Sequence, residues 1–312
     1  ANGTDALELA LRGLGIGRGQ RVLTVANAGF YGSAAILAVG AEPVYADVDP
    51  VTLNLAPQAL AKLMQAQPIH AAIVTHLYGR MADMGAILPL CRAAGVPLIE
   101  DCAQAHGARL DGRVAGAFGD VACFSFYPTK NLGALGDGGA LVTDDAALAD
   151  RLCALRQYGW GAKYEVVRAG GRNSRLDELQ AAVLLAKLPL LDGANARRRA
   201  IAARYTKAFH GTSLQAPVIA ADEHVAHLYV VRSPRREALR EHLAARGVAT
   251  DVHYPVPDHR QPVHGGAHGS VHLPVSEAAC QQVLTLPCFP GMTDAQVDHV
   301  IDAVMRFQAE VM

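Results

Sequence analysis

The sequence predicts an α/β fold in which a mainly parallel sheet is flanked by helices, followed by a smaller C-terminal α+β domain. Up to about residue 209, short apolar runs alternate with segments of helical periodicity, which is typical of βαβ units. Beyond residue 210 the pattern changes to short strands, a loop rich in His, Gly and Pro (253–274) and a final amphipathic helix. We therefore expect a large domain over 1–209 and a small domain over 210–312.

The expected elements follow from runs of apolar residues bounded by turn residues and from apolar positions at helical spacing. Strands are expected at 21–25, 43–46, 71–75, 97–101, 121–126 and 140–143, and in the small domain at 228–232. Helices are expected at 5–13, 32–39, 83–94, 145–157, 177–188, 195–209, 236–246 and 294–308. Pro189 ends the helix at 177–188, because proline cannot continue it.

Composition narrows the class of protein. The 312 residues are 51% hydrophobic and carry a net charge of −1, so no basic surface for nucleic acid or for an acidic membrane is expected. The six cysteines are dispersed without a C-x-x-C pair, which favours reduced thiols in a cytoplasmic protein. His264, His268 and His272 lie in a loop without a fixed face, so no metal site is expected there.

Lys130 is the strongest candidate for a catalytic residue. It follows the apolar run 121–126 and is surrounded by a proline and several glycines in FSFYPTKNLGALGDGG (124–139). Burial at such a position lowers the pKa of a lysine and makes its amine a nucleophile toward aldehydes. The loops that follow the strands of α/β sheets are also where ligands bind.

Two adjacent acids, Glu100 and Asp101, end the apolar run in VPLIEDCAQAHGA (96–108). Such a pair can simply cap the next helix. Alternatively, one carboxylate can keep a proton on a cationic heterocycle, as the pyridinium nitrogen of pyridoxal phosphate requires.

An anion site is expected at the start of the chain. Asn2, Gly3 and Thr4 precede an amphipathic helix, and Thr4 is the expected N-cap. Free N–H groups at a helix start suit a phosphate. A phosphate loop, an acid and a lysine occur in that order along the chain.

These motifs resemble the DegT/DnrJ/StrS family of nucleotide-sugar aminotransferases, which have the aspartate-aminotransferase-like fold (fold type I) and use pyridoxal 5′-phosphate. The resemblance covers nearly the whole chain. It is carried by NGTDALELAL (2–11), GAEPVYADVDP (40–50), HLYGRMADM (76–84), EDCAQAHGA (100–108), GDVACFSFYPTKNLGALGDGGALVT (119–143), GRNSRLDELQAA (171–182) and DVHYPVPDH (251–259). Members of the family usually continue about fifty residues upstream, so an N-terminal segment is expected to be missing.

The resemblance implies roles for individual residues. Lys130 would form the Schiff base with the cofactor aldehyde and then act as general acid and base, while Asp101 would face the pyridinium nitrogen. Gln104 would donate a hydrogen bond to the phenolic oxygen. Some relatives carry histidine in place of this lysine and are dehydratases, and the lysine present here argues against that chemistry.

The remaining cofactor contacts are also implied by the family. The expected phosphate ligands are Gly3, Thr4 and Ser125. The aromatic ring that stacks on the cofactor aligns without gaps on Gly29, so Phe30 or Tyr31 would have to replace it. Asn173 resembles the asparagine that reaches the phosphate of the neighbouring subunit in a homodimer with shared active sites, although it could equally cap the helix that follows.

The expected substrate pocket is bordered by His76, Tyr78, His253 and Tyr254. Core packing is the alternative for the tyrosines, and a buried, hydrogen-bonded ring is the alternative for the histidines. The arginine run 197–199 could grip a diphosphate, but a solvated helix face is the simpler interpretation.

The resemblance implies transfer of an amino group from glutamate to a nucleotide-linked keto sugar. The blocks at 76–84 and 253–259 look most like relatives that aminate C3 of dTDP-3-keto-6-deoxyhexoses, with a 4-keto sugar as the close alternative. A cyclitol ketone aminotransferase and a cofactor-binding regulator without turnover are the remaining alternatives.

Overall fold

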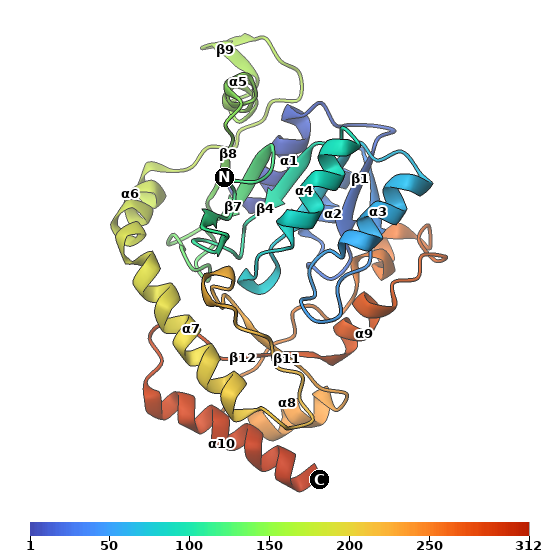
Figure 1. The fold of residues 1–312 in the computed structure, drawn as a ribbon. Helices are drawn as coiled ribbons and strands as arrows, with labels where there is room; N and C mark the ends of the chain where they lie inside the picture. Colours follow the sequence, from blue (N-terminus) through green and yellow to red (C-terminus); the bar gives the residue numbers. More distant parts are fainter. Residues whose placement is uncertain (312) are drawn as a thin grey trace.

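The computed structural model describes residues 1–311 and contains one large sheet with helices on both faces (Figure 1). The strand order is β2-β1-β3-β4-β7-β8, in which β8 is antiparallel to β7 and all other neighbours are parallel. The bounds are β1 Arg21–Val25, β2 Glu42–Ala46, β3 Ala71–Thr75, β4 Leu98–Asp101, β7 Val121–Ser125 and β8 Gly139–Val142. The expected strands of the large domain are confirmed to within one residue at each end.

Successive strand residues face opposite layers, and each layer has its own apolar core. On one face, Val22, Ile73 and Ile99 pack with the helices α1 (Gly3–Gly13), α2 (Tyr31–Ala38) and α5 (Ala146–Leu155). On the other face, Leu23, Val74 and Leu98 pack with α3 (Pro57–Ala66) and α4 (Met84–Ala93). A sheet buried on both faces explains why its strands are continuous apolar runs rather than alternating ones.

The C-terminal part forms a second core around an antiparallel pair, β11 (Tyr229–Arg232) and β12 (Val283–Leu286). The helices α8 (Arg236–Ala244) and α10 (Asp294–Val311) cover it, and the long helix α7 (Leu191–Ala208) runs along its side (Figure 1). Ile201, Ala202 and Tyr205 of α7 belong to this core, so the C-terminal unit draws on residues before 210.

Several elements were not expected from the sequence. They are α3, α9 (Pro274–Gln282), β12, and the short hairpins β5–β6 (Arg109–Leu110, Arg113–Val114) and β9–β10 (Trp160–Ala162, Glu165–Val166). In α3, Leu60 is buried and Leu63 and Met64 pack against the same core, so the helical spacing of apolar residues is present in this segment. The helix α6 (Glu178–Lys187) is followed by a 3₁₀ turn at Leu188–Leu190 that leads directly into α7, four residues earlier than expected.

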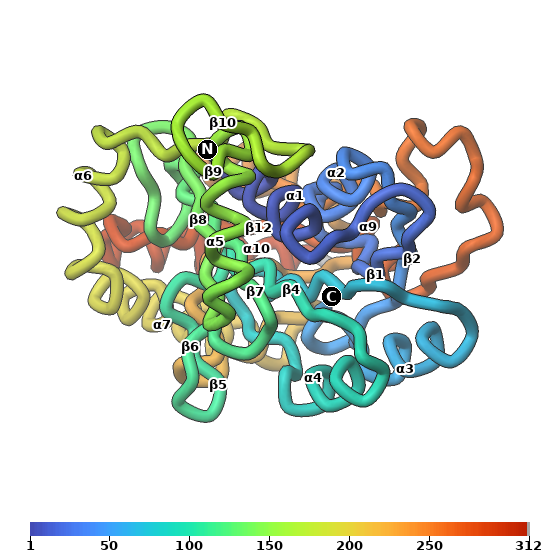
Figure 2. Tube along the Cα trace, turned by 90° about the horizontal axis from the view of Figure 1, so that it is seen from above, coloured from blue at the N-terminus to red at the C-terminus, as the bar shows by residue number. Residues whose placement is uncertain are grey.

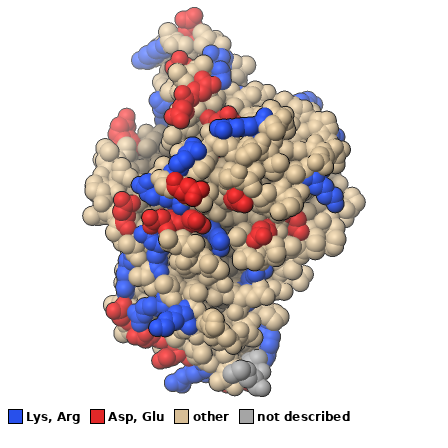
Figure 3. Space-filling model, viewed as in Figure 1, with Lys and Arg blue, Asp and Glu red and all other residues tan. Residues whose placement is uncertain are grey.

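Charged residues of both signs are mixed on the surface that Figure 3 shows. On the face seen in Figure 3, lysines and arginines alternate with acids, and large areas carry no charge. No helix among residues 1–311 combines the length and the apolarity needed to cross a bilayer.

The His-rich segment 253–274 extends from the edge of the large sheet (Figure 2) and is anchored by Asp258. Asp258 is buried, and its carboxylate accepts hydrogen bonds from Phe30 N (3.0 Å) and Ser33 Oγ (2.6 Å) at the start of α2. Phe30 has no side-chain cap of its own, so a residue distant in sequence caps this helix. Burial raises the pKa of Asp258 to about 7, although both hydrogen bonds act in the opposite direction.

The raised pKa of Asp258 predicts a pH-dependent stability. Between about pH 4 and pH 7 the folded state holds a proton on this carboxyl that the unfolded state has lost, so its contribution falls as the pH rises through that window. Asp258→Asn does not titrate. Between about pH 4 and pH 7 its free energy of unfolding should therefore fall by up to about 4 kcal/mol less than that of the wild type. Urea unfolding of both proteins at several pH values measures it. Asp302→Asn, on the exposed face of α10, is the control and should keep the wild-type slope.

Candidate active site

A cavity of about 850 Å³ lies at the carboxyl ends of β3, β4 and β7, where the large sheet meets the C-terminal unit. Ligands of open α/β sheets bind at this edge. The predicted site residues that line it are Gly3, Thr4, Tyr31, Asp101, Gln104, Ser125, Lys130, His253 and Tyr254. Phe30, His76, Tyr78 and Asn173 do not line it.

Lys130 and Asp101 both face the cavity and influence each other. Burial lowers the pKa of Lys130, and the nearby carboxylate of Asp101 partly offsets that effect. Burial raises the pKa of Asp101, against the hydrogen bonds from Ala103 N (3.1 Å) and Thr75 Oγ1 (3.3 Å) and the charge of Lys130. The cavity therefore contains an amine whose pKa is lowered, that of Lys130, and a carboxyl whose ionised form a nearby cation would stabilise, that of Asp101.

The anion site at the start of α1 differs in detail from the expectation. The N-cap is Asn2, whose Oδ1 accepts from Asp5 N at 2.8 Å, so the assignment of Thr4 as the cap is wrong. The helix begins two residues earlier than predicted because Asn2 is itself a good capping residue. The N–H groups of Gly3 and Thr4 have no acceptor among the described residues, and both residues line the cavity.

Gly3 is required by the close packing of α1 against the end of β7. A Cβ on Gly3 would lie 2.6 Å from Cβ of Ser125, which is far inside van der Waals contact. The absence of a side chain thus brings the Ser125 hydroxyl beside the helix N-terminus. A phosphate there would meet two free N–H groups and one hydroxyl.

Gln104 is held in place by two hydrogen bonds. Its Oε1 accepts from Tyr78 N at 2.6 Å, and its Nε2 donates to Tyr254 Oη at 3.1 Å. The Tyr78 hydroxyl in turn donates to the carbonyl of His253. Tyr78 therefore contacts two residues of the cavity wall, Gln104 and His253, without lining the cavity itself. The prediction that Tyr78 borders the substrate pocket is corrected accordingly.

The structure separates the two candidate aromatic residues. Tyr31 is half exposed and lines the cavity, and its ring approaches that of Tyr254 edge-on at 6.1 Å. Phe30 points instead toward His264, with 5.7 Å between ring centroids. Tyr254 also packs directly on Gly29, where a Cβ would lie 2.7 Å from its ring.

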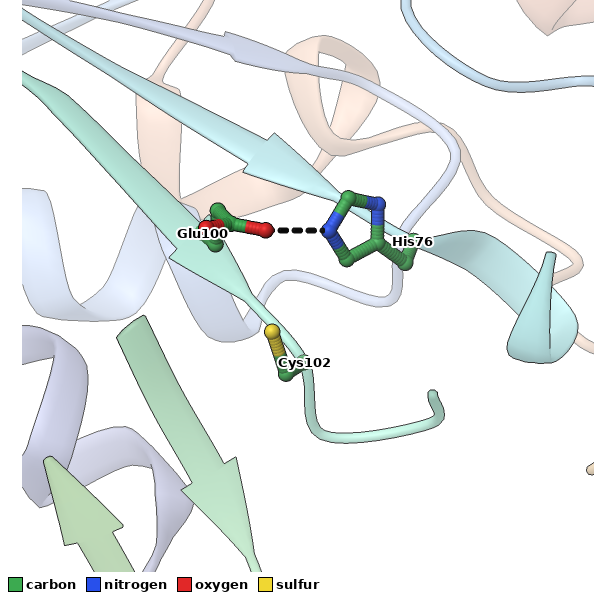
Figure 4. Close-up of side chains that lie close together, drawn as sticks. All are labelled: His76, Glu100 and Cys102. Atoms are coloured by element: carbon green, nitrogen blue, oxygen red, sulfur yellow. Dashed lines mark hydrogen bonds and ion pairs between the residues drawn. The ribbon is translucent and has the colours of Figure 1, made fainter. Parts of the chain in front are cut away.

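His76 lies in a buried cluster with Glu100 and Cys102 (Figure 4). Its Nδ1 accepts from Ala82 N at 3.1 Å, which makes Nε2 the protonated nitrogen that donates to Glu100 Oε2 at 2.9 Å. The imidazole is fully buried and both nitrogens are used. The expectation that His76 borders the substrate pocket is therefore corrected to a satisfied histidine of the core.

Glu100 is saturated as well. It accepts from the N–H groups of Gly116, Phe118 and Gly119 at 2.7–3.0 Å in addition to His76. Burial acts to raise its pKa, but these donors hold the pKa below its usual value. With its lone pairs occupied and the His76 Nε2 protonated, the cluster has no free ligand set for a metal ion.

Asn173 is exposed and lies outside the cavity of its own chain. Its neighbours tie the loop to α1, since Arg172 pairs with Asp5 (3.2 Å) and with Glu8, and Ser174 Oγ donates to Asp5 Oδ2 at 2.8 Å. The loop is thus fixed to the helix that opens at the anion site.

Some cavity residues were not anticipated from the sequence. They include Thr75, Asp137, His227, Asp251 and Phe289, whereas Arg198 belongs to the arginine run 197–199 noted in the sequence. Thr75 could have been found, because it ends β3 and neighbouring parallel strands end at one edge of the sheet. His227 carries no local signal, since only the packing of the C-terminal unit brings it to the cavity, and the sequence does not show that Arg198 is the one member of its run that lines the cavity.

The contact between Gly3 and Ser125 gives a stability prediction. Gly3→Ala should destabilise the protein by about 1–3 kcal/mol through overpacking, measured by urea unfolding. Adding Ser125→Gly removes the opposing Cβ, so the double variant should be more stable than the sum of the two single effects. Gly17→Ala is the control, because its Cβ would meet only Val39 O, at 3.7 Å. Additive effects of the two changes would contradict the proposed clash.

Comparison with known proteins agrees with this geometry. The chain is 41% identical over 98% of its length to a "Pleiotropic regulatory protein" of Geobacillus stearothermophilus, covering 83% of it. It is 46% identical over 99% of its length to the dTDP-3-amino-3,4,6-trideoxy-alpha-D-glucose transaminase of Streptomyces venezuelae, covering 82% of it. The crystal structure of S. venezuelae DesV in complex with a ketimine intermediate superposes with a TM-score of 0.94 at 46% identity, covering 98% of this chain and 83% of that one. The model of the DegT/DnrJ/EryC1/StrS aminotransferase family matches residues 1–305, and the chain belongs to that family.

Proposed function

We propose that this aminotransferase uses pyridoxal 5′-phosphate to move an amino group from glutamate to a nucleotide-linked keto sugar. The observation that carries the proposal is the cavity in which Lys130, with a lowered pKa, faces Asp101, with an anion site at the other end. A lysine, an acid and a phosphate cradle are the groups that this cofactor requires.

The residues present fit the cofactor. The free N–H groups of Gly3 and Thr4 and the hydroxyl of Ser125 would hold the phosphate, and Asp101 would hold the ring nitrogen. Of the two candidate rings, Tyr31 lines the cavity and Phe30 does not, so Tyr31 would stack on the cofactor. When bound, pyridoxal phosphate supplies an electron sink that allows a proton to leave the carbon bearing the amino group.

The chain's own groups then have separate tasks. Asp101 would keep a proton on the ring nitrogen, because a buried carboxylate is stabilised by a cation beside it. Lys130 would carry a proton to and from the reacting carbon, and burial lowers the pKa of its amine, which favours release of that proton. Gln104, oriented by Tyr78 N and Tyr254, would donate from Nε2 to the phenolic oxygen.

The relatives favour a 3-keto sugar as acceptor. The 46%-identical transaminase of S. venezuelae is named for a dTDP-3-amino sugar, and one from Aneurinibacillus thermoaerophilus, 44% identical, is named for dTDP-3-amino-3,6-dideoxy-alpha-D-galactopyranose. We therefore place amination at C3 of a dTDP-linked 6-deoxyhexose. His253 and Tyr254, which line the cavity, would border this sugar.

A regulator without turnover is the second candidate, because one relative is named a pleiotropic regulatory protein. The complete set of Lys130, Asp101 and the anion site favours catalysis. A protein that only sensed the cofactor would not need an amine with a lowered pKa beside it.

We infer a homodimer in which each site uses both chains. The helix α6, the 3₁₀ turn that follows it and the loop after Lys130 expose five leucines (Leu135, Leu179, Leu185, Leu188 and Leu190), which we call the α6 surface. Exposed apolar groups gathered in this way mark interaction sites. A two-fold axis there would bring each Asn173 loop near the partner's cavity.

The function is tested with a substrate panel. Protein loaded with cofactor is mixed with glutamate and dTDP-linked 3-keto or 4-keto 6-deoxyhexoses, free keto hexoses or cyclitol ketones, and 2-oxoglutarate release is followed. The 3-keto nucleotide sugar should react fastest, because remote nucleotide contacts help to place the reacting carbon. Lys130→Ala should abolish transfer and the visible absorption of bound cofactor, whereas Lys62→Ala, on α3, should keep both. Transfer by Lys130→Ala, or equal rates with free keto hexoses, would contradict the proposal.

Shared sites are tested by mixing two inactive variants, Lys130→Ala and Asn173→Asp. Lys130→Ala lacks the reacting amine, and the carboxylate added by Asn173→Asp repels the cofactor phosphate, so neither homodimer should catalyse transfer at an appreciable rate. In the mixed dimer one site collects both lesions and the other neither, so part of the activity should return after subunit exchange. A dimer that exchanges subunits without recovery would place Asn173 within its own site.

A further inference from the structure

The arginine run on α7 divides into two surface residues and one buried residue. Arg197 pairs with Asp294 at 2.8 Å, and Arg199 pairs with Asp222 at 3.3 Å. Arg198, between them, is only 7% exposed and lines the active-site cavity. The interpretation of the run as a solvated helix face therefore holds for the outer two residues only.

Arg198 is anchored through one nitrogen. Its Nη1 donates to the carbonyls of Cys288 (2.5 Å), His227 (3.2 Å) and Ala226 (3.4 Å), all in the C-terminal unit. Its Nε is buried without a hydrogen-bond partner, and its Nη2 has no acceptor among residues 1–311. Nε and Nη2 lie on the same edge of a guanidinium, and this is an edge that binds carboxylates in a bidentate manner.

The charge of Arg198 is not compensated by the described part of the chain. Burial lowers the pKa of this guanidinium, and no carboxylate acts on it in the opposite direction. Arginine keeps its proton, so an uncompensated buried cation is costly unless an anion joins it. Lys130 and Arg198 are the only lysine and arginine that line the cavity among residues 1–311.

We infer that the free edge of Arg198 binds a carboxylate of the amino donor, and of the 2-oxo acid left after transfer. This inference rests on the proposed function and adds a specificity residue to it. Arg198 thereby selects an amino acid over a simple amine as the source of the amino group.

The position of Arg198 favours a carboxylate over the diphosphate of a nucleotide sugar. After burial, the charges of Lys130 and Arg198 both lower the pKa of His227, so both cations lie near that ring. In an amino acid the α-carboxylate is one bond from the carbon that reacts. In a nucleotide sugar, ring atoms and the glycosidic oxygen separate the diphosphate from the keto carbon. The cofactor phosphate is accounted for by Gly3, Thr4 and Ser125.

The test measures binding of 2-oxoglutarate by calorimetry to holoenzyme in the aldehyde form, together with KM for glutamate and for the keto sugar. Arg198→Lys keeps the charge but loses the planar fork. It should raise the Kd of 2-oxoglutarate and the KM for glutamate by about 10- to 100-fold, the scale of lost charged hydrogen bonds. The KM for the sugar should change by less than threefold. Arg199→Lys, whose parent pairs with Asp222 at the surface, is the matched control and should behave as wild type.

Each outcome decides the inference. A larger effect on the sugar KM than on the donor would assign Arg198 to the diphosphate, and unchanged binding of both would make it a structural anchor only. If the variant does not fold, the wild-type holoenzyme should still bind 2-oxoglutarate and not its neutral dimethyl ester, and equal binding of the two would overturn the carboxylate site. Absence of amino transfer in the wild type would refute the proposed function, while the calorimetry would still measure carboxylate binding at Arg198.

Discussion

Burial of two adjacent carboxylates at the end of β4 is the constraint that the surrounding structure satisfies. Glu100 and Asp101 point to opposite faces of the sheet, as successive strand residues must. Four donors saturate Glu100, three of them backbone N–H groups of the segment before β7 and one from His76 after β3. That network joins the carboxyl ends of β3 and β4 to the segment that leads into β7, so the strand end that carries Asp101 is held rigidly. The carboxylate of Asp101 accepts only two hydrogen bonds within the described residues and faces the cavity, and burial raises its pKa. One carboxylate stabilises the edge of the sheet, and the other is left available to a cation.

The second constraint is the distance between α1 and the strands. Gly3 and Gly139 both lack room for a side chain, since a Cβ on Gly139 would lie 2.3 Å from Asn2 O. The N-terminus of α1 therefore lies directly on the ends of β7 and β8. Its free N–H groups reach the cavity from the end where Ser125 stands. Helix packing, and not a separate binding loop, creates the anion site.

The sequence predicted the large sheet well because its strands are buried on both faces and read as continuous apolar runs. Lys130, Asp101 and Ser125 each follow or end such a run, so the rule that parallel strands end at one edge placed them together. The sequence could not show whether Tyr31 or Phe30 lines the cavity, because the backbone conformation at the start of α2 decides which ring turns inward. His76 follows β3 just as Asp101 ends β4, yet its ring turns into the core. The choice depends on donors and acceptors from residues 82 and 100, which no local pattern reveals.

The active-site cavity also contains residues that do not come from the large sheet. The sheet supplies groups suited to a cofactor, whereas Arg198, His227 and His253 approach from the opposite wall. An aminotransferase must admit an amino acid and a second, chemically different substrate to the same space in turn. A carboxylate-binding arginine fully free in the cavity would collapse onto an acid, such as Asp101 or Asp251, whenever the amino acid left. Arg198 avoids this because Nη1 stays bound to three carbonyls, which keeps the guanidinium in place and leaves only its other edge to be satisfied by each substrate in turn. Because one side of its guanidinium is anchored, Arg198 can bind the carboxylate of the amino acid and still stay in position when the second substrate occupies the cavity.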